Sequence, residues 1–312
     1  MELTSPQIRK FKKLRVSITE QCNLSCMYCD MKNIFFQKSG EVDLSLLLKI
    51  IENLHKQLDL SSIRLTGGEP ALHPDLPEFI RELKKLGIPE VNLTTNGYYL
   101  KNLLPELKNS GLDRINISLD AIDEDIFANI TGQRGATRVM DSILAANLAG
   151  FKIKINSIIM RGINESQILS LLEFAMKHQI IIRFLELMKM GSILDTHDDL
   201  FYSQAEIISQ IQSHFEIIEL PRQISSTASY FYVNNVISFG IIANHSQPFC
   251  QDCDRLRLDH LGNLYGCLSN PVSFALPQKK SGEYKMILEN LMALKQKEEF
   301  TGSNLNMRQI GG

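Results

Sequence analysis

The stretch KLRVSITEQCNLSCMYC, residues 13–29, places three cysteines directly after a strand-like run. In residues 13–18 charged or polar side chains alternate with apolar ones, a pattern typical of a β-strand. The thiols follow at the spacing Cys-x3-Cys-x2-Cys, and three thiols cannot pair off as disulfides. A loop after a strand can instead wrap them around a compact object, so the stretch predicts a metal or redox site beside the first strand.

The rest of the first 190 residues repeats the order of strand, loop and helix. Further strand-like runs lie at residues 61–66, 90–95, 114–119, 152–160 and 180–187. Helical patterns separate them at residues 43–58, 76–87, 100–111, 137–150 and 165–179, and Asp43 is the predicted N-cap of the first. Six such units predict an α/β fold with a parallel sheet. We expect a partial (βα)6 barrel of the TIM type, with a flat open sheet as the alternative.

Polar residues collect at the carboxyl ends of the predicted strands, where barrel enzymes build their active sites. They lie in residues 66–69, 94–96 and 118–120 and at Asn156. Met188 stands at the same place after the sixth predicted strand. The first strand also alternates strictly, so that Arg15, Ser17 and Thr19 share one face. Helices cover the outside of a parallel sheet, and such a polar face therefore predicts a polar barrel lumen.

The pattern changes after residue 190. A helical stretch at residues 203–215 leads to two antiparallel strands, 229–233 and 236–242, which a turn at Asn234 and Asn235 joins. A hairpin-like segment with three cysteines and a last helix at residues 282–296 follow. We therefore divide the chain into a barrel, residues 1–190, and a smaller C-terminal domain, residues 191–312.

Composition excludes several classes of protein. The 312 residues are 44% hydrophobic and carry a formal net charge of −2, so no global basic field recruits nucleic acid or an anionic membrane. The N-terminus lacks the features of a secretory signal, and no apolar run is long enough to span a bilayer. A cytoplasmic protein is predicted, and closely spaced cysteines in such a protein indicate metal or redox chemistry.

The first triad, Cys22, Cys26 and Cys29, has no fourth Cys or His in its loop, whereas structural zinc needs four ligands. A [4Fe–4S] cube takes one ligand per iron, so three cysteines leave one iron open for chemistry. The spacing matches the motif of the radical S-adenosylmethionine (SAM) superfamily, in which the open iron chelates SAM. Zinc completed by a distant histidine is the alternative. The Gly-Gly-Glu-Pro turn in residues 65–70 matches the superfamily's SAM-ammonium turn.

A second triad, Cys250, Cys253 and Cys267, has the spacing Cys-x2-Cys-x13-Cys. Here His245 or His260 could complete a zinc site, and spacing alone does not decide between zinc and iron–sulfur. An open cluster at the first triad makes a second cluster the favoured interpretation.

Several cations are predicted inside the barrel or at its rim. Arg255 and Arg257 are two residues apart, so in an extended segment both guanidinium groups point the same way. Their planar forks suit phosphate oxygens. Together with Arg15, Arg64 and Lys154 they predict a lumen that binds a polyanion.

These motifs together resemble the MoaA family, the radical SAM GTP 3′,8-cyclases that perform the first step of molybdenum cofactor biosynthesis. The resemblance runs over nearly the whole chain, from residues 14–29 to the terminal Gly311 and Gly312. It implies that Cys22, Cys26 and Cys29 hold the SAM-cleaving [4Fe–4S] cluster, and that Cys250, Cys253 and Cys267 hold a second one whose open iron meets the guanine. Implied SAM contacts are Tyr28, Gly68, Ser118 and Met188. Implied GTP contacts are Arg15, Arg64, Thr94, Lys154, Arg255 and Arg257.

The implied reaction converts GTP to (8S)-3′,8-cyclo-7,8-dihydroguanosine 5′-triphosphate while SAM is cleaved to methionine and 5′-deoxyadenosine. The resemblance also implies an electron donor such as flavodoxin or ferredoxin, delivery of the product to cyclic pyranopterin monophosphate synthase, and a Gly-Gly tail that reaches the active site. The sequence leaves a homodimer open. Two other functions are compatible with the motifs: a radical SAM enzyme that modifies a peptide, and a non-catalytic zinc-binding regulatory protein.

Overall fold

The computed structural model describes residues 10–29, 43–234, 237–276, 281–296, 298–305 and 307–310. The strands of the first half are β1 (Lys13–Ser17), β2 (Ser62–Thr66), β3 (Glu90–Thr95), β4 (Arg114–Ser118), β5 (Lys152–Ile159) and β6 (Ile181–Glu186). Those of the second half are β7 (Ile217–Glu219), β8 (Ser229–Val233), β9 (Ile237–Ile242), β10 (Arg255–Leu258), β11 (Asn263–Tyr265) and β12 (Ser273–Ala275). All six strands predicted before residue 190 are present.

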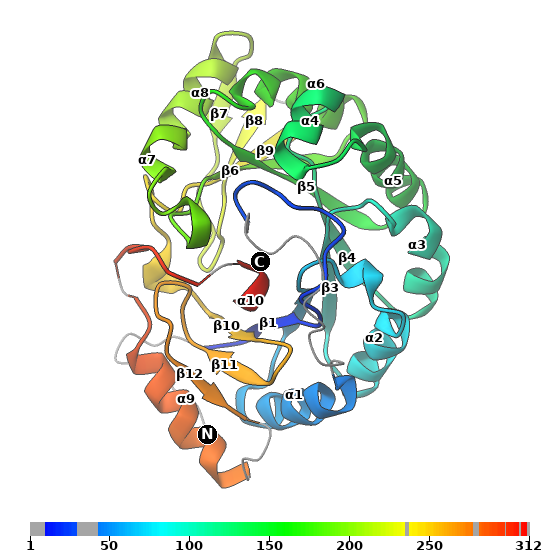
Figure 1. Cartoon of the computed structure of the whole chain (residues 1–312), viewed down its shortest axis with the longest axis vertical. Helices are drawn as coiled ribbons and strands as arrows, with labels where there is room; N and C mark the ends of the chain where they lie inside the picture. The colour runs from blue at the N-terminus through cyan, green and yellow to red at the C-terminus, as the bar shows by residue number, and fades with distance from the viewer. Residues whose placement is uncertain are drawn as a thin grey trace.

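The strands form one sheet in the order β12-β11-β10-β1-β2-β3-β4-β5-β6-β9-β8-β7. Strands β10, β1 to β6 and β9 run parallel to one another, and the pairs at the two ends of the sheet, β12-β11-β10 and β9-β8-β7, are antiparallel. The sheet curves around a central space (Figure 1), which confirms the partial barrel and excludes the flat sheet.

Helices cover the outer side of this barrel (Figure 1). They are α1 (Leu44–Leu58), α2 (Leu76–Lys85), α3 (Leu100–Asn109), α4 (Glu124–Thr131), α5 (Ala136–Leu148) and α6 (Ile168–Lys177). The chain continues with α7 (His197–Leu200), α8 (Gln204–Gln212), α9 (Ser281–Ala293) and α10 (Met307–Ile310). Asp43 caps α1 as predicted, because its side chain accepts a hydrogen bond from Leu46 N at 3.0 Å.

The apolar core lies between the sheet and the helices. Alternate residues of each strand face outward into it, among them Leu14, Val16, Ile63 and Leu65, all at most 1% exposed. The residues between them face the lumen. Packing of the outer faces therefore fixes the register that places the polar side chains inside.

The C-terminal segment shares the sheet of the barrel. Strands β8 and β9 form the predicted antiparallel pair, but β9 also lies parallel to β6, and β10 lies parallel to β1. The segment thus extends both edges of the six-stranded unit, and the division at residue 190 stays a prediction. No helix in the described part of the chain has the length and apolarity to cross a membrane.

Candidate functional site

The lumen of the barrel holds a cavity of about 640 Å³. The cysteines of both triads and all residues with implied SAM or GTP contacts line this cavity, although they come from distant parts of the chain. They are the cysteines 22, 26, 29, 250, 253 and 267, together with Arg15, Tyr28, Arg64, Gly68, Thr94, Ser118, Lys154, Met188, Arg255 and Arg257. The structure brings all of them together, and their individual roles stay predictions.

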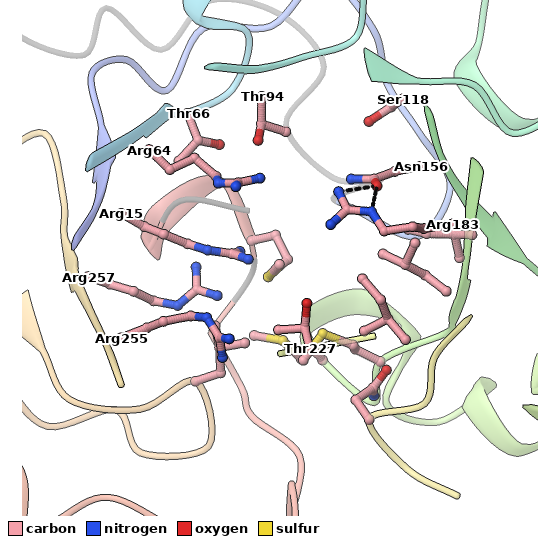
Figure 2. Close-up of a pocket in the computed structure, with 18 of the residues that line it drawn as sticks. Arg15, Arg64, Thr66, Thr94, Ser118, Asn156, Arg183, Thr227, Arg255 and Arg257 are labelled. Carbon is pink, nitrogen blue, oxygen red and sulfur yellow. Dashed lines mark hydrogen bonds between the residues drawn. The ribbon is translucent and has the colours of Figure 1, made fainter. Parts of the chain in front are cut away.

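Three arginines form a row across neighbouring strands. Arg15 on β1 is the register partner of both Arg257 on β10 and Arg64 on β2. Register partners on adjacent strands lie about 4.8 Å apart and point to the same face. Figure 2 shows their guanidinium groups, with that of Arg255, directed from one side into the cavity.

Burial and mutual repulsion depress the basicity of this row. Burial, and then the charges of Arg257, Arg64, Arg255 and Arg183, hold the pKa of Arg15 well below its usual value. Burial, and then Arg183 and Arg255, lower the pKa of Arg64 to about 9. Burial also lowers the pKa of Arg257 to about 10. A polyanion in the cavity would neutralise these charges, whereas the row by itself is electrostatically unfavourable.

Arg183 on β6 is a further lumen cation, which the sequence reasoning missed. It reaches in from the opposite side of the cavity and donates two hydrogen bonds to Asn156 Oδ1, at 2.9 and 2.6 Å (Figure 2). Its side chain is buried, and burial lowers its pKa. The sequence could have indicated this residue, because Arg183 lies within the largely apolar run of residues 180–187 and charged side chains are rare in buried strands.

Lys154 and Arg255, both predicted to contact GTP, have partners within the protein. Lys154 donates to the hydroxyl of Tyr230 at 2.6 Å. Arg255 donates to the carbonyl of Ser225 at 2.5 Å, in a loop that Asp252 also holds by accepting from Ser225 N at 2.8 Å. Residues 223–227 of this loop line the cavity beside the second cysteine triad. Arg255 therefore positions one wall of the cavity as well as contributing charge.

The Gly-Gly-Glu-Pro turn packs against the loop of the first triad. Gly68 N donates to Thr19 O and Glu69 N donates to Gln21 O, each at 2.7 Å. A Cβ atom on Gly68 would lie 2.2 Å from Gln21 O, so only glycine fits. The close approach thus serves the cysteine loop, while Gly68 also faces the cavity.

Glu69 fixes the neighbouring strand end from inside the protein. Its carboxylate accepts hydrogen bonds from Thr95 Oγ1, Asn96 N and Ala71 N at 2.6 to 2.9 Å. Burial raises the pKa of Glu69 to about 7 against the opposing effect of these three bonds. The side chain of Asn96 in turn reaches Cys22 Sγ at 3.9 Å, so this strand end is tied to the first triad.

Tyr28 is held by a buried carboxylate. Its hydroxyl donates to Asp120 Oδ2 at 2.7 Å, and Asp120 Oδ1 accepts from Ile158 N at 2.8 Å. Asn164 clamps the two strand ends by donating to the carbonyls of Asp120 and Ile158 at 2.8 Å each. Burial raises the pKa of Asp120 to about 6. The network fixes the ring of Tyr28 at the predicted SAM position.

Replacing Asp120 with alanine is expected to weaken SAM binding without removing any predicted SAM contact. Loss of the acceptor leaves the hydroxyl of the half-buried Tyr28 without this partner, at about 1–3 kcal/mol or roughly 5- to 150-fold in affinity. Asp120→Asn keeps an oxygen acceptor and should weaken binding less. Equilibrium binding of SAM to the anaerobically loaded protein measures the effect, and Asp141→Ala, at an exposed position on α5, is the control. Wild-type affinity in Asp120→Ala would remove Asp120 from the site.

The second triad lies where β10 begins and β11 ends. Burial alone would raise the pKa of Cys253, but the charges of Lys295 and Arg255 lower it to about 7. Lys295 Nζ and Arg255 Nη1 donate to Cys253 Sγ at 3.5 and 3.6 Å. A thiolate that accepts such bonds is the form of cysteine that binds metal. Lys295 had no signal in the sequence, because it ends a helical pattern where lysines are common.

The two histidines offered as zinc ligands have other neighbours. The ring of His245 stacks on His197 and lies near Phe201, with centroids 5.8 and 5.1 Å apart. His260 Nδ1 lies 3.7 Å from a carboxylate oxygen of Glu20. No three His, Cys, Asp or Glu side chains among the described residues are arranged to hold a single ion.

The donors around the thiols fit an iron–sulfur cube. All six cysteines lie in the described part of the chain, and none of them forms a disulfide. Zinc needs its ligands on one ion, whereas a [4Fe–4S] cube takes each cysteine on a different iron. Leu24 N also donates to Cys22 Sγ at 3.4 Å, and hydrogen bonds to ligand sulfurs are typical of such clusters.

The C-terminal residues return into the barrel. Helix α10 lies inside the ring of strands (Figure 1), Ile310 is fully buried, and Arg257 donates to its carbonyl at 3.4 Å. Ser303 bridges to the segment around Met190 through hydrogen bonds with Lys189 O and Gly191 N. The predicted tail, Gly311 and Gly312, lies outside the described residues.

Comparison with known proteins gives two family matches and close relatives. Residues 16–175 match the radical SAM superfamily, and residues 180–300 match the family described as Molybdenum Cofactor Synthesis C. A GTP 3′,8-cyclase of Synechocystis sp. is 33% identical over 97% of this chain and 93% of its own length. A GTP 3′,8-cyclase of Staphylococcus aureus strain Mu3 is 37% identical over 83% of this chain and 79% of its own.

Among solved structures, Streptococcus suis SuiB is similar in fold. Its complex with the precursor peptide SuiA has a TM-score of 0.67 and 16% identity, and covers 88% of this chain and 64% of that one. Its complex with S-adenosylmethionine has the same TM-score and covers 90% of this chain and 67% of that one. At this identity the likeness concerns the fold alone.

Proposed function

This chain belongs to the radical SAM superfamily and, within it, to the GTP 3′,8-cyclases, and from this premise we propose how its cavity carries out that reaction. The enzyme converts GTP to (8S)-3′,8-cyclo-7,8-dihydroguanosine 5′-triphosphate, with cleavage of SAM to methionine and 5′-deoxyadenosine. The observation that carries the proposal is the row of three arginines, buried Arg257 and half-buried Arg15 and Arg64, in one cavity with both cysteine triads.

We assign the triphosphate to the arginine row. Its guanidinium groups lie in the cavity on neighbouring strands and have depressed pKa values, so a bound polyanion relieves their repulsion. Lys154, Thr94 and Arg255 complete the wall. Several charge-assisted bonds to phosphate also hold the ribose in one place, which is what makes a single hydrogen accessible to attack.

We assign the cysteines to two [4Fe–4S] clusters, the first on Cys22, Cys26 and Cys29 and the second on Cys250, Cys253 and Cys267. When bound, the first would supply the electron for reductive cleavage of SAM to methionine and a 5′-deoxyadenosyl radical. Tyr28, Gly68, Ser118 and Met188 bind and orient SAM, and Asp120 fixes Tyr28 by its hydrogen bond. Hydrogen abstraction from C3′ of GTP would let C3′ bond to C8 of the guanine, and one electron from the external donor together with one proton would then reduce the radical left on the guanine ring.

The barrel contributes by excluding water from this cavity. A primary carbon radical attacks almost any C–H bond, so solvent and stray side chains must be kept away. Helix α10 enters the lumen and buries Ile310 beside Arg257, which narrows access to the cavity. An external electron donor such as flavodoxin or ferredoxin, transfer of the product to cyclic pyranopterin monophosphate synthase, and work in the cytoplasm remain parts of the proposal.

A peptide substrate has weaker support. The structural neighbour with a bound peptide is 16% identical, and the cations of this chain face the lumen, where they suit a compact polyanion. The zinc-binding regulatory protein requires ligands gathered on one ion, an arrangement that the described residues lack.

The direct assay is anaerobic incubation of the iron-loaded enzyme with GTP, SAM and a reductant. We expect the cyclised triphosphate and 5′-deoxyadenosine to form together, measured by liquid chromatography and mass spectrometry. ATP in place of GTP is the control, because it carries the same phosphates on a different base. SAM cleavage that is indifferent to GTP, with no GTP consumed, would refute the substrate assignment.

A further inference from the structure

Lys295 is a buried lysine that the reaction outlined above does not use. It follows α9, and only 6% of it is exposed. An ammonium group removed from water is unfavourable unless its three N–H donors find acceptors. Lys295 Nζ donates to Gly266 O at 2.6 Å, to Arg255 O at 2.7 Å and to Cys253 Sγ at 3.5 Å.

These three acceptors lie in the two segments that carry the second cysteine triad. We call these segments its arms: residues 250–255 with Cys250 and Cys253, and residues 266–267 with Cys267. Arg255 is two residues after Cys253, and Gly266 directly precedes Cys267. The ammonium therefore joins the strand that follows one pair of cysteines to the strand that precedes the third. The backbone carbonyls fix the spacing of the two arms, and the bond to sulfur acts on a cysteine that is predicted to bind iron.

The surroundings of the Lys295 ammonium are closely packed. A Cβ atom on Gly266 would lie 2.6 Å from Leu291 O, so glycine at this position lets the end of α9 approach closely. The ring of Phe11 lies 5.2 Å from Nζ on another side, which adds a cation–π contact. The ammonium is thus held between two backbone carbonyls, a cysteine sulfur and an aromatic ring.

We propose that Lys295 is a positioning residue of the second iron–sulfur site, which holds the two arms of the triad together and sets the reduction potential of the cluster. This inference rests on the proposed function, in which the triad binds a [4Fe–4S] cluster. Hydrogen bonds to ligand sulfurs and nearby positive charge both stabilise the more negative, reduced form of a cluster. Lys295 supplies both to Cys253.

The test uses the full-length chain with Cys22, Cys26 and Cys29 changed to alanine, so that only the second cluster is present. Lys295→Met keeps the length of the side chain and removes its charge and donors. Lys295→Gln keeps two N–H donors and removes the charge. Lys285→Met, at a partly exposed position on α9 beside Glu289, is the matched control. Iron and sulfide per chain, thermal unfolding and the midpoint potential from an EPR-monitored titration are measured for each variant.

Both Lys295 variants are expected to shift the midpoint potential to more negative values, and Lys295→Met to lose part of its iron, while Lys285→Met matches the parent. If Lys295→Met does not fold, Lys295→Gln decides. A Lys295→Gln protein with the parent's iron load and an unchanged potential overturns the inference, even if its thermal stability is reduced. Zinc without sulfide in the parent protein would instead overturn the proposed function.

Discussion

Changing Cys22 to alanine is expected to abolish SAM cleavage. Cys22 lines the lumen, and its sulfur accepts a hydrogen bond from Leu24 N at 3.4 Å, which is the environment of a cluster ligand. The predicted [4Fe–4S] cube has three cysteine ligands and one open iron, and without Cys22 only two of these ligands remain. The loss should be complete rather than partial, because SAM needs an intact cube.

The measurement is 5′-deoxyadenosine formed from SAM under anaerobic, reducing conditions, together with iron analysis. The parent should carry about eight irons per chain, and the variant about four, held by the second triad. Cys250→Ala is the matched control, since it should lose iron from the other site. GTP should still bind to Cys22→Ala. A variant that cleaves SAM at the parent's rate would exclude Cys22 from the cluster.

Changing Arg257 to alanine is expected to weaken GTP binding while leaving SAM binding intact. Arg257 is 7% exposed and lies in register with Arg15, and burial lowers its pKa to about 10. Loss of one charge-assisted hydrogen bond to phosphate amounts to about 1.5–3 kcal/mol, or roughly 10- to 150-fold in Kd. Arg257→Lys should recover only part of this, because lysine keeps the charge and loses the fork.

Isothermal titration with GTP and then with SAM separates the two effects. Arg81→Ala is the control, since Arg81 lies on the surface of α2 and pairs with Glu78. We also expect the ligand-free Arg257→Ala protein to unfold at the same temperature as the parent or higher, because the substitution removes one of several charges that repel one another. GTP affinity equal to that of the parent would place the triphosphate elsewhere in the cavity.

The barrel and most of its helices could be predicted from the sequence because local signals agree with the fold. Asp43 is an example. It is a favourable N-cap residue directly before a helical pattern, and in the structure it caps α1 by accepting a hydrogen bond from Leu46 N. Helix α4 was not predicted. It has only eight residues, too few for a clear helical repeat of apolar positions, although Gly132 marks its C-terminal end. Short helices depend more on tertiary packing than on their own pattern.

The site could be predicted where the chemistry of a residue conflicts with its surroundings. Arg15 and Arg64 lie on strands of a parallel sheet that helices cover, and the sheet register then makes them neighbours. Lys295 and the pairing of β10 with β1 could not be foreseen, because both depend on contacts between segments far apart in the chain. The sequence matches the turn in residues 65–70 to the SAM-ammonium turn, and the structure adds a close approach of this turn to the protein's own cysteine loop.

The central claim is that the lumen directs a SAM-derived radical to the ribose of GTP. The most direct measurement is reaction of the loaded enzyme with GTP deuterated at C3′, followed by mass spectrometry of the 5′-deoxyadenosine. Our account predicts one deuterium in 5′-deoxyadenosine for each cyclised nucleotide formed. Unlabelled 5′-deoxyadenosine, with deuterium retained at C3′, would contradict it.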